Sequence, residues 1–416
     1  MTPGYRSTIF SPIAVPGRSA VILLCSLLLA AFGLLGTGCV LIPGKAPANT
    51  RIKPQPVRLP ARILSHFFLV ESPQTDGKTY RFMIDTGSSV TLVSPAVAAA
   101  LKQKEKRQTP PRTLPVRGAN GREVELPAVT LREFWLGEAL FERVPASVYD
   151  FSELSAHLGL TIDGVVGFPL FRDTLVTLDY LNAQLEIAPN PVVAAPPVRQ
   201  PRTSIIPYNR ERATPHIPVQ MENESFFVLI DSGSDGGLAL NPAGLHPRFA
   251  SGPRIGMIVS SLDGDKRQLV GRLDQNITIG TQLVQQPVVD LTEQLSSLGG
   301  ELLRHFRITF DQQRHLVTLV RHTDGPVAMP GRRSTGLSFR RFPNYWRLIA
   351  VVPDTPNSAL AVQPGDLCVR INGELVEKWT IERYGELVNS AAKITYTFLS
   401  GSKETDHEVE VFELVP

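Results

Sequence analysis

The stretch Arg81-Phe-Met-Ile-Asp85-Thr-Gly-Ser-Ser-Val90 places a carboxylate at the end of an apolar run. Aspartate is depleted in strands, and this one is followed at once by a small hydroxyl residue and a glycine. The stretch 227–242, FVLIDSGSDGGLALNP, repeats the pattern of 81–95, RFMIDTGSSVTLVSP. When the two stretches are aligned, Asp231 occupies the position of Asp85.

A second pair of similar stretches follows further along the chain, in the same order. VGFPLFRDTLVTLD (166–179) aligns with LGGELLRHFRITFD (298–311). Each has a glycine before an apolar pair, then an arginine, and then a strand-like run that ends in Asp179 or Asp311. Similar halves in matching order predict a duplication, and therefore a pair of lobes related by a pseudo-two-fold axis.

The bulk composition is that of a globular protein. The chain has 416 residues, of which 43% are hydrophobic and 19% charged, so the length fits two or three domains with real cores. Lysine and arginine total 42 against 39 aspartate and glutamate, a net charge of +3. Such a small surplus of positive charge does not indicate a nucleic-acid-binding surface, and no nucleic-acid partner is expected.

Cysteine and histidine give no sign of a metal or redox site. The chain has three cysteines, Cys25 and Cys39 near the N-terminus and Cys368 far downstream, so neither a disulfide framework nor a thiolate metal site is expected. The histidines are scattered, without the HExxH spacing of catalytic zinc sites. No metal or organic cofactor is implied, and Cys368, in a predicted buried strand, is expected to be a core residue.

The N-terminus, residues 1–39, is predicted to be a targeting segment. Basic residues precede the apolar run SAVILLCSLLLAAFGLLGTGCVLI (19–42), and no charge follows until Lys45. The part of this run that ends at Cys39, LLGTGC, resembles a bacterial lipoprotein signal, although Gly36 stands where that signal usually has leucine. The resemblance implies a lipidated Cys39; the alternative is an uncleaved transmembrane anchor, for which the run is long enough. Both predict a membrane-anchored chain that faces the periplasm of a bacterial cell envelope.

Pro-rich stretches at 43–60, 188–202 and 325–331 divide the rest of the chain. Short apolar runs with turn signals dominate between them, and helical patterns are confined to 94–105 and 151–159, so the architecture is predicted to be mostly β. The predicted parts are a Pro-rich tether (40–60), a first lobe (61–190), a linker (191–204), a second lobe (205–321), a second linker (322–333) and a C-terminal domain (334–416).

Around the two Asp turns, over residues 60–320, the chain resembles the aspartic peptidases of the pepsin and retroviral type. The resemblance is carried by Ile84-Asp85-Thr86-Gly87-Ser88 and Ile230-Asp231-Ser232-Gly233-Ser234. It implies a two-lobed, pseudo-symmetric acid-protease fold with closed, barrel-like lobes. It also implies that Asp85 and Asp231 share a proton and activate water for peptide hydrolysis, because two adjacent carboxylates do not both ionise easily.

The residues that follow each Asp have expected supporting roles. Gly87 and Gly233 let the backbone turn tightly and approach its twin. By the resemblance, Thr86 and Ser232 hydrogen-bond across the pseudo-two-fold axis. All four residues are therefore expected to hold the two turns together.

A serine follows in both turns. Ser88 and Ser234 are hypothesised to donate their hydroxyls to the ionised carboxylate, which would lower its pKa and shift the activity optimum towards acid. Asp235 would act in the opposite direction, because a neighbouring negative charge raises the pKa of a carboxyl group.

In this family an apolar segment that ends in glycine crosses behind each turn. IDGVVGF (162–168) fits that segment, whereas LSSLGGE (295–301) keeps the glycine but little of the apolar pair. The family also covers its cleft with a hairpin flap. LPVRGANGREVELP (114–127) is predicted to be such a hairpin with its tip at Gly118, Asn120 and Gly121, and 258–273 is its counterpart. The alternative is that both are ordinary surface hairpins.

The C-terminal domain resembles a PDZ domain through VVPDTPNSALAVQPGDLCVRINGELV (351–376). The resemblance implies a strand, a small-residue helix at Ala359-Leu-Ala361, a Pro-Gly-Asp turn and an Asn-Gly hairpin, with 381–391 as the helix beside a peptide groove. Such domains bind extended peptides, often at a free C-terminal carboxylate. The residues expected to bind it are Gly336, Leu337, Ser338 and Phe339, with Ser338 in the place of the family's second glycine.

Arg340 and Arg341 follow this loop, and two interpretations of them remain open. They can attract an acidic peptide terminus, or they can be the solvated end of a strand.

The sequence therefore predicts an envelope-anchored aspartic-type endopeptidase that acts on peptide or protein substrates, with a peptide ligand on the PDZ domain. The rival is a catalytically inactive peptide-binding or scaffolding protein that retains the peptidase fold. Taken alone, Asp85 is equally compatible with a turn or cap residue, and only its pairing with Asp231 is specific. The run DSGSDGG (231–237) also has a superficial likeness to the serine motif of chymotrypsin-type proteases, but the residue order differs and no matching upstream His motif occurs.

Overall fold

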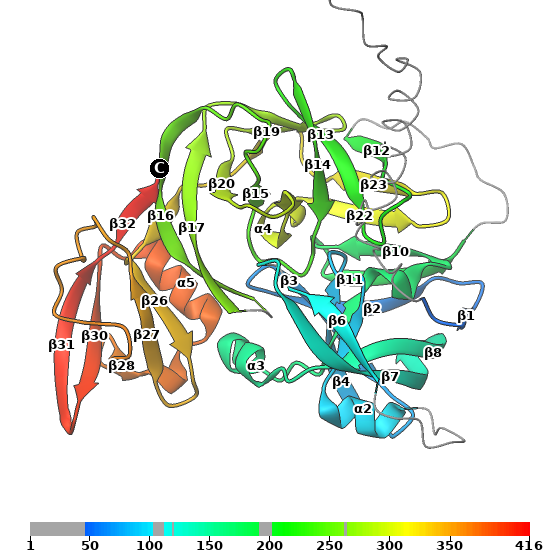
Figure 1. Cartoon of the computed structure of the whole chain (residues 1–416), viewed down its shortest axis with the longest axis horizontal. Coiled ribbons are helices and arrows are strands. Elements are labelled where there is room, and N and C mark those ends of the chain that lie inside the picture. The colour runs from blue at the N-terminus through cyan, green and yellow to red at the C-terminus, as the bar shows by residue number, and fades with distance from the viewer. Residues whose placement is uncertain (1–45, 103–111, 119, 191–201, 262–263) are drawn as a thin grey trace, which may run out of the picture. The chain divides into compact units, whose positions relative to one another are not determined.

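Strands make up most of the computed structural model, which describes residues 46–102, 112–118, 120–190, 202–261 and 264–416 (Figure 1). The prediction of a mostly β protein is confirmed. Cys39, the targeting segment, and parts of the predicted tether and first linker lie outside the described residues. Within those ranges, no helix combines the length and the hydrophobicity that a membrane crossing requires.

The first group of elements ends before residue 190, and its two α-helices fall where helical patterns were predicted. The elements are β1 (Asn49–Arg51), β2 (Val57–Leu64), β3 (Phe67–Pro73), β4 (Thr79–Asp85), β5 (Thr91–Val93), α2 (Pro95–Leu101), β6 (Thr113–Arg117), β7 (Glu123–Leu136), β8 (Ala139–Val148), α3 (Ser152–Leu158), β9 (Gly164–Gly167), the 3-10 helix η1 (Phe168–Phe171), β10 (Thr174–Asp179) and β11 (Gln184–Pro189).

The second group repeats the order of the strands around the Asp-containing strand, but residues 241–248 form no helix in the place of α2, and β18 and β19 are additional. Its elements are β12 (Thr203–Pro207), β13 (His216–Met221), β14 (Glu224–Ile230), β15 (Leu238–Leu240), β16 (Phe249–Ser261), β17 (Gly264–Leu273), β18 (Ile277–Ile279), β19 (Gln282–Gln285), β20 (Val288–Leu291), β21 (Ser297–Leu298), α4 (Gly300–Leu303), β22 (Phe306–Asp311), β23 (Leu316–Arg321) and β24 (Val327–Ala328).

Both groups pair their strands identically around the Asp-containing strand. β4 ends at Asp85 and lies parallel to β9, β9 pairs antiparallel with β5, and β5 lies parallel to β8. β14 ends just before Asp231 and lies parallel to β21, β21 pairs antiparallel with β15, and β15 lies parallel to β20. We call residues 67–171 the first repeat and residues 216–303 the second repeat.

The two repeats are joined by a sheet in which β10 pairs antiparallel with β22. Thr177 lies opposite Thr309, and their hydroxyl oxygens are 2.8 Å apart. The two positions correspond in the sequence alignment, since each lies two residues before the Asp that ends its strand. Corresponding positions of the two aligned stretches therefore meet at this point of the sheet. Apolar side chains from both repeats share one core, in which Phe168 and Phe310 make an edge-to-face contact.

The prediction of closed, barrel-like lobes is wrong for the described residues. The strand order β12-β23-β22-β10-β11-β2-β3-β4-β9-β5-β8-β7-β6 is open, and so is the order β16-β17-β20-β15-β21-β14-β13-β18-β19-β24. One end of each path is a long hairpin, β6–β7 or β16–β17. The outer strand of each hairpin pairs with its own hairpin partner and does not return to the far edge of the sheet, so neither sheet closes.

Residues 334–416, which we call the C-terminal module, have a sheet and a core of their own around Trp346 and Tyr396. Its sheet order is β26-β27-β28-β30-β31, and β25 joins it to the preceding segment by pairing with β32. The elements are β25 (Arg332–Ser334), β26 (Leu337–Arg341), β27 (Trp346–Val351), β28 (Leu367–Ile371), β29 (Glu374–Leu375), the 3-10 helix η2 (Val376–Lys378), α5 (Ile381–Ser390), β30 (Lys393–Ser400), β31 (Lys403–Glu410) and β32 (Phe412–Val415).

The small-residue helix expected at Ala359–Ala361 is wrong, because residues 353–361 form a series of turns. Two prolines in this segment lack the N–H donors that a helix uses. The buried side chain of Asn357 instead fixes the segment by donating to Thr335 O at 2.9 Å and to Glu410 O at 2.7 Å.

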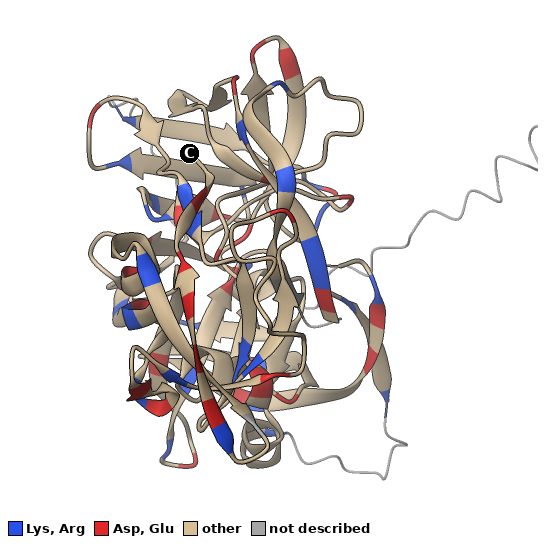
Figure 2. Ribbon diagram, turned by 90° about the vertical axis from the view of Figure 1, so that its left-hand side faces the viewer, with Lys and Arg blue, Asp and Glu red and all other residues tan. Residues whose placement is uncertain are grey.

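Charged residues in the described part of the chain are spread over most elements, with both signs interspersed (Figure 2). This agrees with the small net charge of the sequence.

Candidate active site

The two Asp turns have the same local geometry. Each begins where a strand with buried apolar residues ends, and each folds its backbone N–H groups back onto the carboxylate. Gly87 N and Ser88 N donate to Asp85 Oδ1 at 2.8 and 2.9 Å, and Gly233 N donates to Asp231 Oδ1 at 3.0 Å. Such bonds stabilise the charged form and fix the direction of the carboxylate.

Four hydrogen bonds tie one turn to the other. Thr86 N donates to Ser232 Oγ at 3.0 Å, and Ser232 N donates to Thr86 Oγ1 at 3.1 Å. Each hydroxyl then donates to the carbonyl that precedes the opposite Asp, Thr86 Oγ1 to Ile230 O at 2.7 Å and Ser232 Oγ to Ile84 O at 2.8 Å. Both hydroxyl residues are buried, so each group of the network has its partner inside the protein.

The glycine of each turn faces the carboxylate of the other. A Cβ atom placed on Gly87 would collide with the carboxylate of Asp231, and one placed on Gly233 would collide with that of Asp85. A side chain at either position would therefore push the carboxylates apart. The structure thus brings together Asp85, Asp231 and the two glycines between them.

The pKa values of both carboxyl groups are raised above the ordinary value of an aspartate. Removal from water raises the pKa of Asp85 well above its ordinary value, and the charge of Asp231 raises it further, against the lowering effect of the Gly87 and Ser88 N–H groups. Desolvation also raises the pKa of Asp231, whereas the N–H of Gly233 and a hydrogen bond with Asp85 lower it. The pair therefore holds one proton at a pH where an isolated carboxyl group is ionised.

The hydrogen bonds of Ser88 contradict the hypothesis about its hydroxyl, whereas the donation expected from the Ser234 hydroxyl stays a prediction. Ser88 Oγ donates to Val90 O at 2.7 Å, so its hydroxyl hydrogen does not reach the carboxylate. Its backbone N–H lowers the pKa of Asp85 instead. Ser234 Oγ accepts from Gly236 N at 3.3 Å. Both hydroxyls shape the loop after the turn, which sequence alone did not reveal because it depends on where that loop bends.

The glycine-ended segments lie behind both turns. Phe168 N donates to Ser88 O at 2.9 Å, and at the equivalent place Gly300 N donates to Ser234 O at 2.7 Å. A Cβ on Gly167 would collide with Val90 O, and one on Gly299 would collide with the backbone after Ser234. The segment 295–301 therefore has the same position in the second repeat, although its sequence matched the family pattern poorly.

The two hairpins, one from each repeat, meet near their tips. The first closes with Gly118 N donating to Arg122 O at 2.9 Å and Gly121 N donating to Gly118 O at 3.0 Å, with Gly121 at a φ of 87°. Asn120 Nδ2 donates to Gly264 O of the second hairpin at 2.7 Å. The repeats thus touch at the level of the Asp turns and again at the hairpins.

Sequence analysis missed Arg332, which lies in the predicted second linker. Its guanidinium pairs with Asp290 at 2.6 Å and faces Glu301 at 3.6 Å. Glu301 N in turn donates to Gly236 O, just beyond the Asp231 turn, at 3.1 Å. An arginine beside a Pro-rich stretch carries no signal for such a contact, because its acidic partners come from β20 and α4, which are distant in the sequence.

The remaining predicted site residues lie elsewhere. Gly336, Leu337, Ser338 and Phe339 belong to the C-terminal module, where Gly336 N donates to Ser334 Oγ at 2.8 Å and Leu337 N to Thr335 Oγ1 at 3.3 Å. Arg341 is buried and donates to His157 O and Trp379 O. It is therefore not a solvated strand end.

Comparison with known proteins agrees with the geometry of the first turn. Residues 72–170 match the family model of aspartyl proteases. This match covers the Asp85 turn, the first hairpin and the segment that ends at Gly167, and it supports a retropepsin-like aspartyl protease domain in this part of the chain. A search of the curated proteins found no match.

Proposed function

We propose that the chain is an aspartic-type endopeptidase with a two-lobed acid-protease fold, formed by the two repeats, and that Asp85 and Asp231 are its catalytic pair. One observation carries the proposal: the reciprocal hydrogen bonds of Thr86 and Ser232 hold the two carboxylates against each other. The family match in the first repeat supports the same class of activity.

In this mechanism one carboxyl group keeps a proton while the other acts as a base on a water molecule. The water attacks the scissile carbonyl carbon, and its proton passes to the ionised carboxylate. The protonated partner hydrogen-bonds to the developing oxyanion. Proton transfer to the departing nitrogen then breaks the C–N bond. The two hairpins, with Asn120 at the tip of the first, would cover the bound peptide.

For the C-terminal module we propose a PDZ domain that binds substrate or partner peptides beside Gly336–Phe339. For residues 1–39 we propose a lipoprotein signal with Cys39 as the lipidated residue, or else a transmembrane anchor, so that the protein faces the periplasm. Mass spectrometry of the mature N-terminus distinguishes the two, since only lipidation adds acyl mass to Cys39.

The decisive experiment measures cleavage of a mixed peptide library from acid to neutral pH by the wild type, Asp85→Asn and Asp231→Asn. Asp173→Asn, at the surface beside Arg172, is the matched control. We expect both active-site variants to lose activity by at least about 10²-fold and the control to keep it. A wild type that cleaves nothing would favour the inactive peptide-binding protein. Loss in Asp85→Asn alone would exclude a catalytic pair within one chain.

A further inference from the structure

The hairpin β16–β17 lies against the C-terminal module as well as against the first hairpin. The described residues belong to one compact unit, so these contacts lie within a single body. Arg340 pairs with Asp265 of the hairpin at 2.6 Å, and Ile258 N donates to Ser338 Oγ at 3.2 Å. Both module residues come from β26. The hairpin thus contacts the module through Asp265 and Ile258, and it contacts Asn120 of the first hairpin through Gly264.

A β-bulge in β16 lies where the hairpin contacts the module. The register of β16 with β17 shifts between Ile255 and Ile258, so the strand carries an extra residue there. A bulge of this kind bends the strand and re-aims the side chains beside it. Met257 consequently lies against the module, with its sulfur 3.2 Å from Ser334 Oγ and 3.7 Å from Ser338 Oγ.

The same face of the module also reaches the first repeat. Arg340 faces Glu153 of α3 at 3.7 Å, and Arg341 Nη1 donates to His157 O at 2.8 Å. β26 therefore contacts α3 of the first repeat and the hairpin β16–β17 of the second repeat. A shift of the module relative to the repeats would be transmitted to the hairpin through Asp265.

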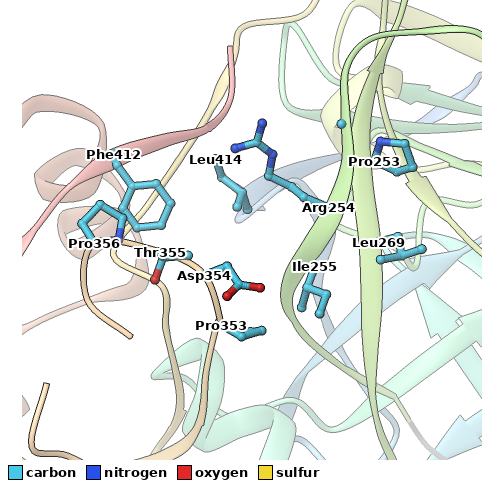
Figure 3. A pocket seen from close by; sticks show the side chains of 11 residues that line it. Pro253, Arg254, Ile255, Leu269, Pro353, Asp354, Thr355, Pro356, Phe412 and Leu414 are labelled. Atoms are coloured by element: carbon cyan, nitrogen blue, oxygen red, sulfur yellow. The ribbon is translucent and has the colours of Figure 1, made fainter. Parts of the chain in front are cut away.

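The interface between the hairpin β16–β17 and the C-terminal module is not filled as one continuous core. A hollow of about 630 Å³ separates the base of the hairpin from the module. As Figure 3 shows, Pro253, Ile255 and Leu269 of the hairpin line one side, and the loop 353–356 with Phe412 and Leu414 lines the other. An apolar cluster of Val270, Val288, Leu414 and Val415 joins β17 to β32 at the base of the hairpin. The polar contacts of Arg340 and Ser338 therefore bear on the part of the hairpin nearer its tip.

We propose that Arg340 and Ser338 are positioning residues for the peptidase site: they act through Asp265 and Ile258 to hold β16–β17 where its end meets Asn120. This inference rests on the proposed function. In the part of the chain that the structure describes, no hydrogen bond joins the hairpin to either Asp turn. We therefore expect its position to affect peptide binding and not the proton transfer. Loosening the hairpin therefore raises KM and leaves kcat nearly unchanged.

The test is a double-mutant cycle with Arg340→Gln, Asp265→Asn and both together. The matched control is Arg370→Gln, which breaks the pair of Arg370 with Glu404 within the module, away from the hairpin. Two readouts are measured: hydrogen exchange of the amides in 255–270, and kcat and KM for a peptide that the wild type cleaves. We expect each single variant to speed exchange in the hairpin by about fivefold and to raise KM by a similar factor. The double variant should be no worse than either single variant, and the control should match the wild type.

Unchanged exchange in Arg340→Gln, or an equal change in the control, would overturn the proposal. Faster exchange with an unchanged KM would also overturn it, because the hairpin would then have no part in substrate binding. If the wild type cleaves no peptide, the proposed function fails, and the exchange cycle by itself still decides whether the module holds the hairpin.

Discussion

Thr86 and Ser232, 146 positions apart in the chain, exchange hydrogen bonds: each backbone N–H donates to the hydroxyl of the other, at 3.0 and 3.1 Å. Each hydroxyl donates its own hydrogen to a buried carbonyl of the opposite strand. Since all these groups are withdrawn from water, none can be lost without leaving its partner unsatisfied. This reciprocity explains why a small hydroxyl residue follows each Asp.

Replacement of Thr86 by alanine should destabilise the protein by about 2–4 kcal/mol, because the N–H of Ser232 and the carbonyl of Ile230 lose their partner inside the protein. Thr86→Ser is the matched control, since it keeps the hydroxyl and loses only a methyl group, at a cost of about 1 kcal/mol. Urea unfolding monitored by circular dichroism measures both. Equal losses in the two variants would contradict the role of the hydroxyl.

The double variant Thr86→Ala/Ser232→Ala should lose less stability than the sum of the two single variants. Each substitution breaks a different pair of the four bonds, but all four depend on the same close approach of the two turns, which the first substitution already loosens. We expect an interaction term of about 1 kcal/mol or more in the unfolding free energies. Strict additivity would mean that the two hydroxyls act independently.

Gly233→Ala should abolish peptide cleavage, because the new methyl group collides with the carboxylate of Asp85 and separates the pair. Gly385→Ala is the matched control: Gly385 lies in α5 with open space around its Cβ position, and alanine there should stabilise the helix by about 0.5–1 kcal/mol. Cleavage rates and unfolding midpoints of the two variants are compared. An active Gly233→Ala enzyme would argue against close approach of the two turns.

The raised pKa of Asp85 makes stability depend on pH with a definite sign. Between the unfolded pKa, about 4, and the higher folded pKa, the folded protein binds more protons than the unfolded chain, so the free energy of unfolding falls as pH rises. Asp85→Asn removes the titrating carboxyl group and therefore this loss of stability at higher pH. The variant should therefore gain stability over the wild type at pH 7 but gain little at pH 4. The expected difference is about 1.4 kcal/mol for each pKa unit. A gain that is the same at both pH values, in urea titrations, would refute this assignment.

In the C-terminal module, Asn357→Ala should cost about 2–4 kcal/mol, since the buried amide bonds two carbonyls and also accepts from Glu410 N at 3.1 Å. Asn389→Ala is the control, because its exposed side chain lies on the surface of α5. Thermal unfolding of the two variants tests the comparison. If the cost is as small for Asn357 as for Asn389, the amide does not fix the turns of 353–361.

Local sequence determined much of this protein. Alternating apolar residues, the two Asp-hydroxyl-Gly turns, the Asn120-Gly121 tip and the order of the repeats depend on a few neighbouring residues each, so they could be predicted without a structure. The match of 295–301 to its counterpart could not be judged in this way. Its role depends on strand pairing with β14 and β15, and backbone hydrogen bonds tolerate side chains that differ from the family pattern.

Only the tertiary structure decided the direction of the Ser88 hydroxyl, the open sheets, and the docking of Arg332 and Arg340 on acidic residues of the second repeat. These features join segments that lie far apart in the chain or depend on how a loop bends. The sequence by itself specified which two carboxylates belong together. The folded chain decided how closely the two carboxylates are held and which distant residues contact the hairpin and the loops near them. Those contacts depend on how the strands pack, because packing brings together segments that are far apart in the sequence.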